Sequence, residues 1–193
     1  MEKTYDKKID ARSHLSCREV GGRNARRSTV TIRIKLYIRR NTMGNGFFTV
    51  CGIVEIDEKV LLVRHTYGSA KNRILCPGGY VEENELPTCA AEREILEETG
   101  IVVRAKSLLS MQFKSNQWCA VFVMEYVSGT PKSDNHENSE VLLLRPEIAI
   151  ERDDITNMSR ELLKIYIAHK NCGLNKNDYV PKSSTEQDYV LFG

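Results

Sequence analysis

The sequence predicts an α+β fold in which a mixed β-sheet is flanked by helices, as in an α/β/α sandwich. Two β-rich runs precede a helix-forming segment at residues 87–99. Further β-rich runs follow it, and an amphipathic segment at residues 155–170 closes the pattern. This order is typical of a sheet with helices packed on its faces, and 193 residues suffice for one such domain with an appendage.

The first two strands are expected at residues 47–56 and 59–65, and the polar pair Asp57-Glu58 between them indicates a hairpin turn. Residues 66–73 contain Gly, Ser and Asn, which is typical of a loop. The Pro-Gly-Gly sequence at 77–79 is expected to end any strand that reaches it.

The helix predicted at 87–99 has clear end signals. Pro87 suits the first turn, where its missing N–H is not needed, and Gly100 suits the position just past the end. The residues between them are mostly strong helix formers with apolar side chains at helical spacing. Leu86 stands where a capping Ser or Thr is usual, so we expect a weaker N-cap.

After this helix, residues 101–113 and 117–127 are predicted strands, 129–140 a polar turn and 141–144 a short strand. The closing helix is expected to bury one apolar stripe, which consists of Met158, Leu162, Ile165 and Tyr166. Residues 171–193 are polar with late aromatic residues, and we interpret them as a loosely ordered C-terminal tail.

Composition excludes several classes of protein. No apolar run approaches the roughly 18–20 residues that span a bilayer, and the N-terminal residues lack the apolar core of a signal peptide. The six cysteines are dispersed without a C-x-x-C pair, which disfavours a zinc site or a disulfide scaffold. We therefore expect a cytoplasmic protein with reduced, mostly buried thiols and no membrane partner.

Residues 1–42 form a basic leader before the predicted domain at 43–170. The leader holds 12 Lys and Arg against 4 Asp and Glu, whereas residues 43–193 hold 16 against 22, which together give the net charge of +2. A basic arm of this kind can bind nucleic acid through phosphate attraction. Its four acidic residues argue against an organelle-targeting segment.

A third hypothesis is that the leader is disordered or results from a mis-assigned start, with Met43 as the first residue of a bacterial protein. Arg39 and Arg40, if encoded AGG-AGG, form a bacterial ribosome-binding sequence two codons before Met43. The working protein is then acidic, and nucleic acid is an expected partner only if the leader is natural. Arginine codons of the CGN type at these positions would remove the main support for this hypothesis.

The predicted helix at 87–99 concentrates glutamates on one face. Each helical residue turns by about 100°, so Glu94, Glu97 and Glu98 share a short arc. Like charges so placed repel by roughly a few tenths of a kcal/mol per pair. A hard cation such as Mg²⁺, which accepts carboxylate, water and phosphate oxygens, would relieve this crowding. On the triplet alone, an ordinary solvated helix face is the favoured interpretation, because glutamate clusters on helices are common.

The residues around the triplet extend the pattern. They fit G-x5-E-x7-R-E-U-x-E-E-x-G-U, in which U is a bulky apolar residue, and every constrained position matches. The matching residues are Gly79, Glu85, Arg93, Glu94, Ile95, Glu97, Glu98, Gly100 and Ile101. This box resembles the signature of the Nudix hydrolases, the MutT-like pyrophosphohydrolases. The broader resemblance covers about residues 47–170.

The resemblance implies a Nudix-like mixed sheet flanked by helices, with Mg²⁺ or Mn²⁺ as the cofactor. Family members cleave a diphosphate bond in a nucleoside diphosphate linked to a second group. By analogy with the family, Glu94, Glu97, Glu98 and the carbonyl of Gly79 are metal ligands. The metal would lower the pKa of a bound water and hold that water in line with the phosphorus.

The resemblance also implies a general base, which accepts the proton of the attacking water. In this family the base is either a box glutamate or a glutamate on a later loop, so the candidates are Glu94, Glu98 and Glu140. A plain surface role for Glu140 is an equal alternative. Glu85 and Arg93 are expected to form a structural ion pair, because an arginine at the site would otherwise compete with the metal for the carboxylates.

Three cations, Arg64, Lys71 and Arg73, flank the loop that leads into the box. Each is a candidate for binding a substrate phosphate, since cations and phosphate pair well, and solvated loop charges are the alternative. Three aromatic residues follow the box: Phe113, Trp118 and Tyr126. We expect these to pack in the core, with stacking on a nucleobase as the alternative.

The sequence does not select a substrate. ADP-ribose-cleaving relatives tend to carry a Pro after the box and diadenosine-polyphosphate relatives a Tyr, whereas residues 114–118 read KSNQW. The motifs that accompany coenzyme A and NADH cleavage are not evident either. A nucleoside triphosphate or a sugar nucleotide stays open.

Two functions therefore compete. The first is a metal-dependent pyrophosphohydrolase acting on a small-molecule nucleotide, with a homodimer left open as its assembly. The second is a non-catalytic Nudix-like domain that senses a nucleotide and acts through partners. Such domains usually lose box carboxylates, so the complete set here favours catalysis.

Overall fold

The computed structural model describes residues 47–169 and 172–193, so the expectations for the leader at 1–42 and for a start at Met43 lie outside the described residues. The strands are β1 Phe47–Ile56, β2 Lys59–His65, β3 Ile74–Leu75, β4 Gly78–Tyr80, β5 Val102–Lys114, β6 Gln117–Ser128, β7 Asn138–Leu144, β8 Leu174–Asn177 and β9 Leu191–Phe192. The helices are the short 3₁₀ helix η1 Gly68–Ala70, α2 Pro87–Thr99, α3 Pro146–Ile150 and α4 Asn157–His169.

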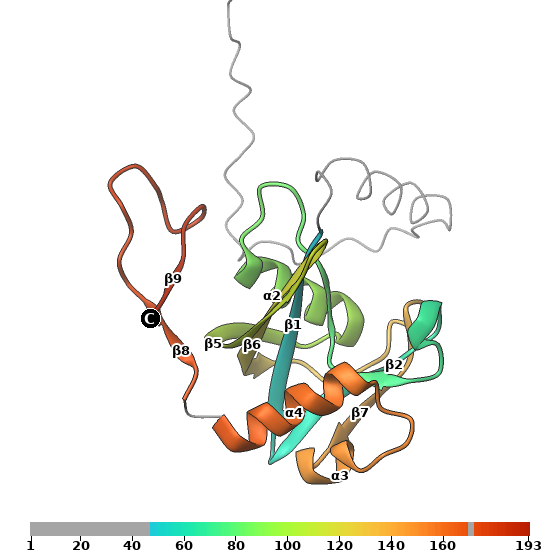
Figure 1. Ribbon diagram of the computed structural model, residues 1–193. Helices are drawn as coiled ribbons and strands as arrows, with labels where there is room; N and C mark the ends of the chain where they lie inside the picture. The colour runs from blue at the N-terminus through green and yellow to red at the C-terminus, as the bar shows by residue number, and fades with distance from the viewer. Residues whose placement is uncertain (1–46, 170–171) are drawn as a thin grey trace, which may run out of the picture.

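The strands form one sheet in the order β3-β2-β1-β6-β5-β8-β9, with β4 paired to β1 and β7 paired to β2 (Figure 1). β1 and β6 run parallel, and the other pairs of named strands are antiparallel. The mixed sheet predicted from the sequence is therefore confirmed. The predicted β1–β2 hairpin is also confirmed. Its turn residues Asp57 and Glu58 have φ angles of 50° and 60°, as a two-residue turn with matching twist requires.

Two apolar clusters, one on each face of the sheet, build the core. One cluster joins β1, β2 and β6 to α3 and α4 and includes Leu62 and Leu163. The other joins the sheet to α2 and includes Leu61 and Ile95, so α2 and α4 lie on opposite faces (Figure 1). Consecutive residues Leu61 and Leu62 enter different clusters because strand side chains alternate between faces. The same alternation decides which polar side chains of β2 and β7 reach α2.

The buried face of α4 differs from the predicted stripe. Leu162 and Tyr166 are buried as expected, whereas Met158 and Ile165 are 39% and 37% exposed. The observed stripe is Ser159, Leu162, Leu163 and Tyr166, with the helical spacing i, i+3, i+4, i+7. It is rotated from the predicted stripe, whose spacing is i, i+4, i+7, i+8. A serine can lie on this face because its Oγ accepts a 3.0 Å hydrogen bond from the N–H of Cys76.

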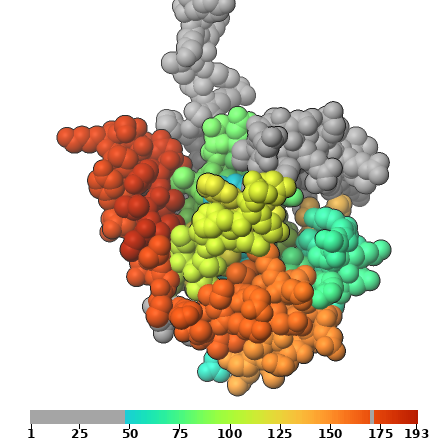
Figure 2. Space-filling model, in the orientation of Figure 1, coloured from blue at the N-terminus to red at the C-terminus, as the bar shows by residue number. Residues whose placement is uncertain are grey.

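Several elements were not predicted. β3 ends at Leu75, before Pro77, as predicted, but Gly78 and Gly79 then begin a further strand, β4. The predicted turn at 129–140 gives way to β7 at Asn138. The segment expected as a loosely ordered tail contains β8 and β9. β8 pairs with β5, and Figure 2 shows this C-terminal segment along one side of the molecule. Phe192 in β9 packs its ring 5.6 Å from that of Phe122.

The expectation that three aromatic residues pack in the core is wrong. Phe113, Trp118 and Tyr126 are 66%, 55% and 37% exposed, because they lie toward the ends of β5 and β6. Among the cysteines that the structure describes, Cys51, Cys76 and Cys119 are buried. Within the described ranges, every helix is too short or too polar to cross a bilayer.

Candidate metal centre

The helix α2 begins and ends where the sequence predicts. Pro87 is its first residue, and Leu86 before it offers no side-chain hydrogen bond, which agrees with an N-cap weaker by roughly 1 kcal/mol. Gly100 adopts a left-handed φ of 72° and donates its N–H to the carbonyl of Leu96 at 2.9 Å. The last turn of α2, which carries Glu98, is therefore well defined.

Glu94 lies on the side of α2 that packs against β4. Its side chain is only 8% exposed. A Cβ added to Gly79 would come within 2.4 to 2.6 Å of the carboxylate atoms of Glu94. Only glycine leaves room for this approach, so the backbone of Gly79 and the Glu94 carboxylate lie side by side.

Glu98 is buried one turn later, with a side chain that is 4% exposed. Its carboxylate accepts a 3.2 Å hydrogen bond from the N–H of Gly78, and Nε2 of His65 is 4.0 Å away. Burial, together with the charge of Glu94, raises the pKa of Glu98 to about 7, while His65 and the Gly78 N–H oppose this shift. A carboxyl group with a pKa near neutrality can exchange a proton at physiological pH.

Arg93 joins several of the box carboxylates. Its Nε and Nη2 donate to both oxygens of Glu85, at 2.8 and 2.9 Å, so the predicted ion pair is confirmed. Its Nη1 also donates to Glu94 at 2.8 Å and lies 3.7 Å from Glu97. Burial lowers the pKa of Arg93, but the contacts with Glu85 and Glu94 raise it more, so the side chain is charged. The contact between Arg93 and Glu94 was not expected.

The chemistry of the residues at α2 fits a hard divalent cation. In the described ranges, no three His, Cys, Asp or Glu side chains already converge as a metal-binding group. Glu97, at 46% side-chain exposure, lies at the rim, whereas Glu94 and Glu98 are buried. Carboxylate oxygens are donors that Mg²⁺ and Mn²⁺ prefer, and the backbone of Gly79, whose carbonyl is the predicted fourth donor, lies beside Glu94. The space that a Cβ at Gly79 would need is taken by the Glu94 carboxylate.

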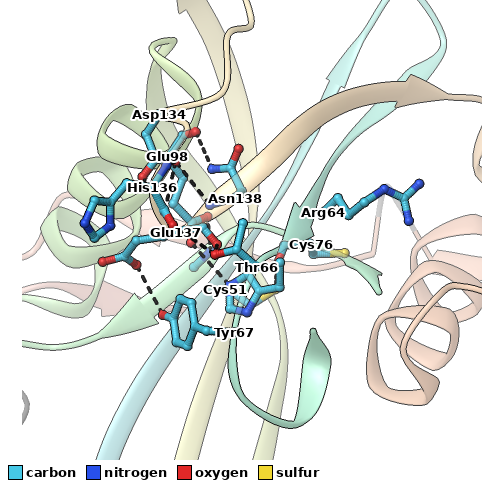
Figure 3. Close-up of polar contacts among 12 residues, drawn as sticks. Cys51, Arg64, Thr66, Tyr67, Cys76, Glu98, Asp134, His136, Glu137 and Asn138 are labelled. Carbon is cyan, nitrogen blue, oxygen red and sulfur yellow. Dashed lines mark hydrogen bonds and ion pairs between the residues drawn. The ribbon is translucent and has the colours of Figure 1, made fainter. Parts of the chain in front are cut away.

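The cations predicted to bind phosphate have other surroundings. Arg64 donates to Glu140 at 2.8 Å and to Asp154 at 2.9 Å, and Figure 3 shows it pointing away from Glu98. Arg73 donates through Nη2 to a backbone carbonyl at residue 155, and Lys71 is exposed at the end of η1. The structure therefore does not bring Arg64 or Arg73 together with the box carboxylates.

The position of Glu140 follows from a β-bulge. In the β2–β7 ladder, Arg64 stands opposite Glu140 and His65 stands opposite Asn138, so Ser139 is an extra residue. A bulge of this kind shifts the alternation of side chains along the strand. Glu140 consequently shares the face of Arg64, and Asn138 shares the face of His65.

These two faces belong to different halves of the molecule. Leu142, like Glu140 an even-numbered residue of β7, packs into the cluster with α3 and α4, whereas Val141 packs into the cluster with α2. Glu140 therefore lies on the sheet face opposite α2, paired with Arg64. The structure does not bring this candidate base together with Glu94 and Glu98.

The residues that do surround Glu98 were not singled out from the sequence (Figure 3). The ring of Tyr67 stacks on His65 at 4.9 Å, and its hydroxyl donates to Glu137 at 3.3 Å. Burial and the charges of Glu137, Glu98 and Glu94 raise the pKa of Tyr67, so its hydroxyl stays protonated beside these carboxylates. The only feature of the sequence that pointed to His65, Tyr67 and Glu137 was their position in or next to two predicted loops.

Comparisons with known proteins agree with this geometry. Residues 47–164 match the model of the NUDIX domain family. An ADP-ribose pyrophosphatase from Methanocaldococcus jannaschii is 31% identical over 131 residues, which cover 63% of this chain and 73% of the relative. A solved NUDIX hydrolase from Nitrosomonas europaea is 27% identical with a TM-score of 0.57, covering 64% of this chain and 71% of that one. A solved nudix hydrolase family member from Chromobacterium violaceum is 25% identical with a TM-score of 0.54, covering 66% of this chain and 81% of that one. By its box, its fold and the matched region, this chain belongs to the NUDIX domain family, that of the Nudix hydrolases.

Proposed function

We propose that this protein is a metal-dependent pyrophosphohydrolase, which cleaves a diphosphate bond in a nucleoside diphosphate linked to another group. One observation carries the proposal. Glu94 and Glu98 are both buried on one helix face, against the backbone of Gly78 and Gly79. Burying two carboxylates is costly unless positive charge compensates them, and oxygen donors of this kind suit Mg²⁺ or Mn²⁺.

In this proposal Glu94, Glu97, Glu98 and the carbonyl of Gly79 hold the cation. When bound, the cation neutralises the charge of the diphosphate and lowers the pKa of water at the site. Glu98 is the first candidate to accept the proton of the attacking water, because its buried carboxylate lies on the helix face that carries the other oxygen donors. Glu94 is the second candidate, but its carboxylate already accepts a 2.8 Å hydrogen bond from Arg93.

The substrate is proposed from the name of a relative. The protein from Methanocaldococcus jannaschii is called an ADP-ribose pyrophosphatase, so ADP-ribose is the first compound to test. Residues 114–118 lack the proline expected of ADP-ribose-cleaving relatives. Sugar nucleotides and nucleoside triphosphates therefore belong in the same panel.

The second candidate function is nucleotide sensing without catalysis. The observation that favours it is the 2.8 Å contact between Arg93 and Glu94, which neutralises one predicted ligand without a metal. The complete set of Glu94, Glu97 and Glu98 supports catalysis instead. We rank the sensor second for that reason.

The decisive experiment is a substrate panel assayed with Mg²⁺ or Mn²⁺. We expect turnover of one class of compound only with the cation, and a loss of about 10²-fold or more in kcat for Glu98→Gln. Glu97→Gln should need more cation for half-maximal rate. Glu161→Gln, an exposed change on α4, is the matched control. Nucleotide binding without turnover of any compound would favour the sensor, and full turnover by both box variants would contradict the ligand assignment.

Two further expectations complete the proposal. The cytoplasm is the proposed compartment, since the buried thiols of Cys51, Cys76 and Cys119 would stay reduced there. A homodimer stays open as the assembly, and sedimentation of the protein used for the activity panel tests it.

A further inference from the structure

The C-terminal end of α2 is held by a segment about 40 residues later in the chain. Asn138, the first residue of β7, is fully buried and donates from Nδ2 to the backbone carbonyl of Glu98 at 2.7 Å. The N–H of Lys132 donates to the carbonyl of Thr99 at 2.8 Å. The last carbonyls of a helix have no partner within it. Two of them are satisfied here by residues 132–138.

The geometry of this segment is set by its own hydrogen bonds. The carboxylate of Asp134 accepts hydrogen bonds from the N–H groups of His136, Glu137 and Asn138, at 3.0 to 3.1 Å. The hydroxyl of Ser133 donates to the carbonyl of Asn138 at 2.8 Å. The extra residue in β7 then turns the Asn138 side chain toward α2.

The same segment also anchors the part of β2 that lies next to the Glu98 carboxylate. Thr66 donates from its N–H to the carbonyl of Glu137 at 3.1 Å, and its hydroxyl lies within 3.0 Å of the carbonyls of His136 and Glu137. These bonds fix the backbone beside His65, whose Nε2 is 4.0 Å from Glu98. The backbone carbonyl of Glu98 and the residue next to its carboxylate, His65, are therefore both anchored to residues 132–138.

Packing alone does not explain an amide at position 138. The Oδ1 of Asn138 is buried and has no hydrogen-bond partner among the described residues. An unpartnered buried acceptor is unfavourable, and an apolar side chain of similar size would avoid it. The hydrogen bond from Nδ2 of Asn138 to the backbone carbonyl of Glu98 accounts for an amide at this position.

We propose that Asn138 is a positioning residue for the candidate metal centre. By holding the carbonyl of Glu98, it fixes the last turn of α2 so that the Glu98 carboxylate stays beside Gly78 and the other oxygen donors. This inference rests on the proposed function, because it assumes that Glu98 is a ligand of the divalent cation. The inference adds Asn138, a residue outside the box, to the residues that shape the candidate metal centre. Only the tertiary structure brings Asn138 next to the box.

The test measures Mn²⁺ binding directly, by the paramagnetic resonance signal of free Mn²⁺ in a titration of the full chain without substrate. We expect Asn138→Leu to weaken Mn²⁺ binding by roughly tenfold, at the lower end of the effect of residues that orient metal ligands. Asp134→Asn, an exposed change that loosens the same segment, should weaken it by a smaller factor. His136→Ala, whose side chain is exposed, is the control and should bind as the wild type does.

Thermal unfolding of each variant separates positioning from stability. A purely structural role for Asn138 lowers the Tm but leaves the Mn²⁺ affinity of the folded protein unchanged, and that result for Asn138→Leu would overturn the proposal. If Asn138→Leu does not fold, Asp134→Asn decides, and unchanged affinity in that variant overturns the proposal. A wild-type protein that binds no Mn²⁺ overturns the proposed function and this role with it. Wild-type binding that all variants match overturns this role alone.

Discussion

Arg64 and Glu140 face each other across the β2–β7 ladder and form a 2.8 Å ion pair on the side of the sheet that carries α3 and α4. Asn138, only two residues earlier, points to α2 because Ser139 is an extra residue in β7. This bulge places Asn138 and Glu140 on opposite faces of the sheet. Glu140 lies away from α2, whereas Glu137 contacts the residues beside the box.

Replacing these two glutamates should have unequal effects on catalysis. We expect Glu140→Gln to keep kcat within about threefold, because its partner Arg64 retains Asp154. We expect Glu137→Gln to lower kcat by about tenfold or more, since its carboxylate holds the hydroxyl of Tyr67 beside the box. Steady-state kinetics on the best substrate of the panel measures both. A larger loss in Glu140→Gln would show that the two faces are wrongly assigned.

Adding a methyl group at Gly79 should disrupt the candidate metal centre. The Cβ of Gly79→Ala would lie within 2.6 Å of the Glu94 carboxylate, so the carboxylate must move. We expect Mn²⁺ binding to weaken by roughly tenfold or more, measured by calorimetric titration. Gly193→Ala is the matched control, because a Cβ there meets no atom within 4 Å. Equal Mn²⁺ affinity in the two variants would exclude Gly79 from the site.

The ion pair between Glu85 and Arg93 should contribute to stability rather than to chemistry. Both side chains are largely buried, at 16% and 23% exposure, and the pair is bidentate. We expect Glu85→Gln to lower the free energy of unfolding by about 2 kcal/mol, measured by urea denaturation. Glu161→Gln breaks an exposed pair with Lys164 and should cost about 0.5 kcal/mol or less. A cost for Glu85→Gln as small as that of the control would contradict the structural role.

Asp154 should make stability depend on acid pH. Hydrogen bonds from Arg152 and Arg64 hold the pKa of Asp154 well below its usual range, although burial opposes them. Because the pKa of Asp154 is lower in the folded chain than in the unfolded chain, where it is near 3.8, the ionised carboxylate stabilises the folded state at pH values above 3.8. This stabilisation is lost as the pH falls from 3.8 through the lowered pKa.

We therefore expect Asp154→Asn to lower the free energy of unfolding at pH 7 by about 1 kcal/mol, a value reduced for the partial exposure of the carboxylate. The difference from the wild type should shrink between about pH 4 and pH 2. Urea denaturation at a series of pH values measures it, with the exposed neighbour change Asp153→Asn as the control. A difference in the free energy of unfolding that stays constant down to pH 2 would contradict this explanation.

The parts of the fold that were predictable depend on local spacing. The β1–β2 hairpin follows from a polar pair between two apolar runs, and α2 follows from Pro87, Gly100 and the helical spacing between them. The pairing of Arg93 with Glu85 was also predicted, because the box itself implies both residues. Each of these features involves residues close in the sequence, so their chemistry is visible without the fold.

Other features escaped prediction because distant segments decide them. β8 has the polar sequence LNKN and becomes a strand only through pairing with β5. The buried stripe of α4 is rotated from the predicted one, because Ser159 finds a partner in Cys76. The periodicity of one segment carries no information about which residues of a distant segment it contacts in the fold.

By itself, the sequence determined the family chemistry of this protein: a box that brings Glu94, Glu97 and Glu98 to one helix face. The tertiary structure decided which residues stand around that box. It assigned Asn138 to the end of α2 and Glu140 to the far side of the sheet, through one extra residue in a strand. The physical reason is that strand side chains alternate with a period of two, so a single bulge reverses which face a carboxylate occupies.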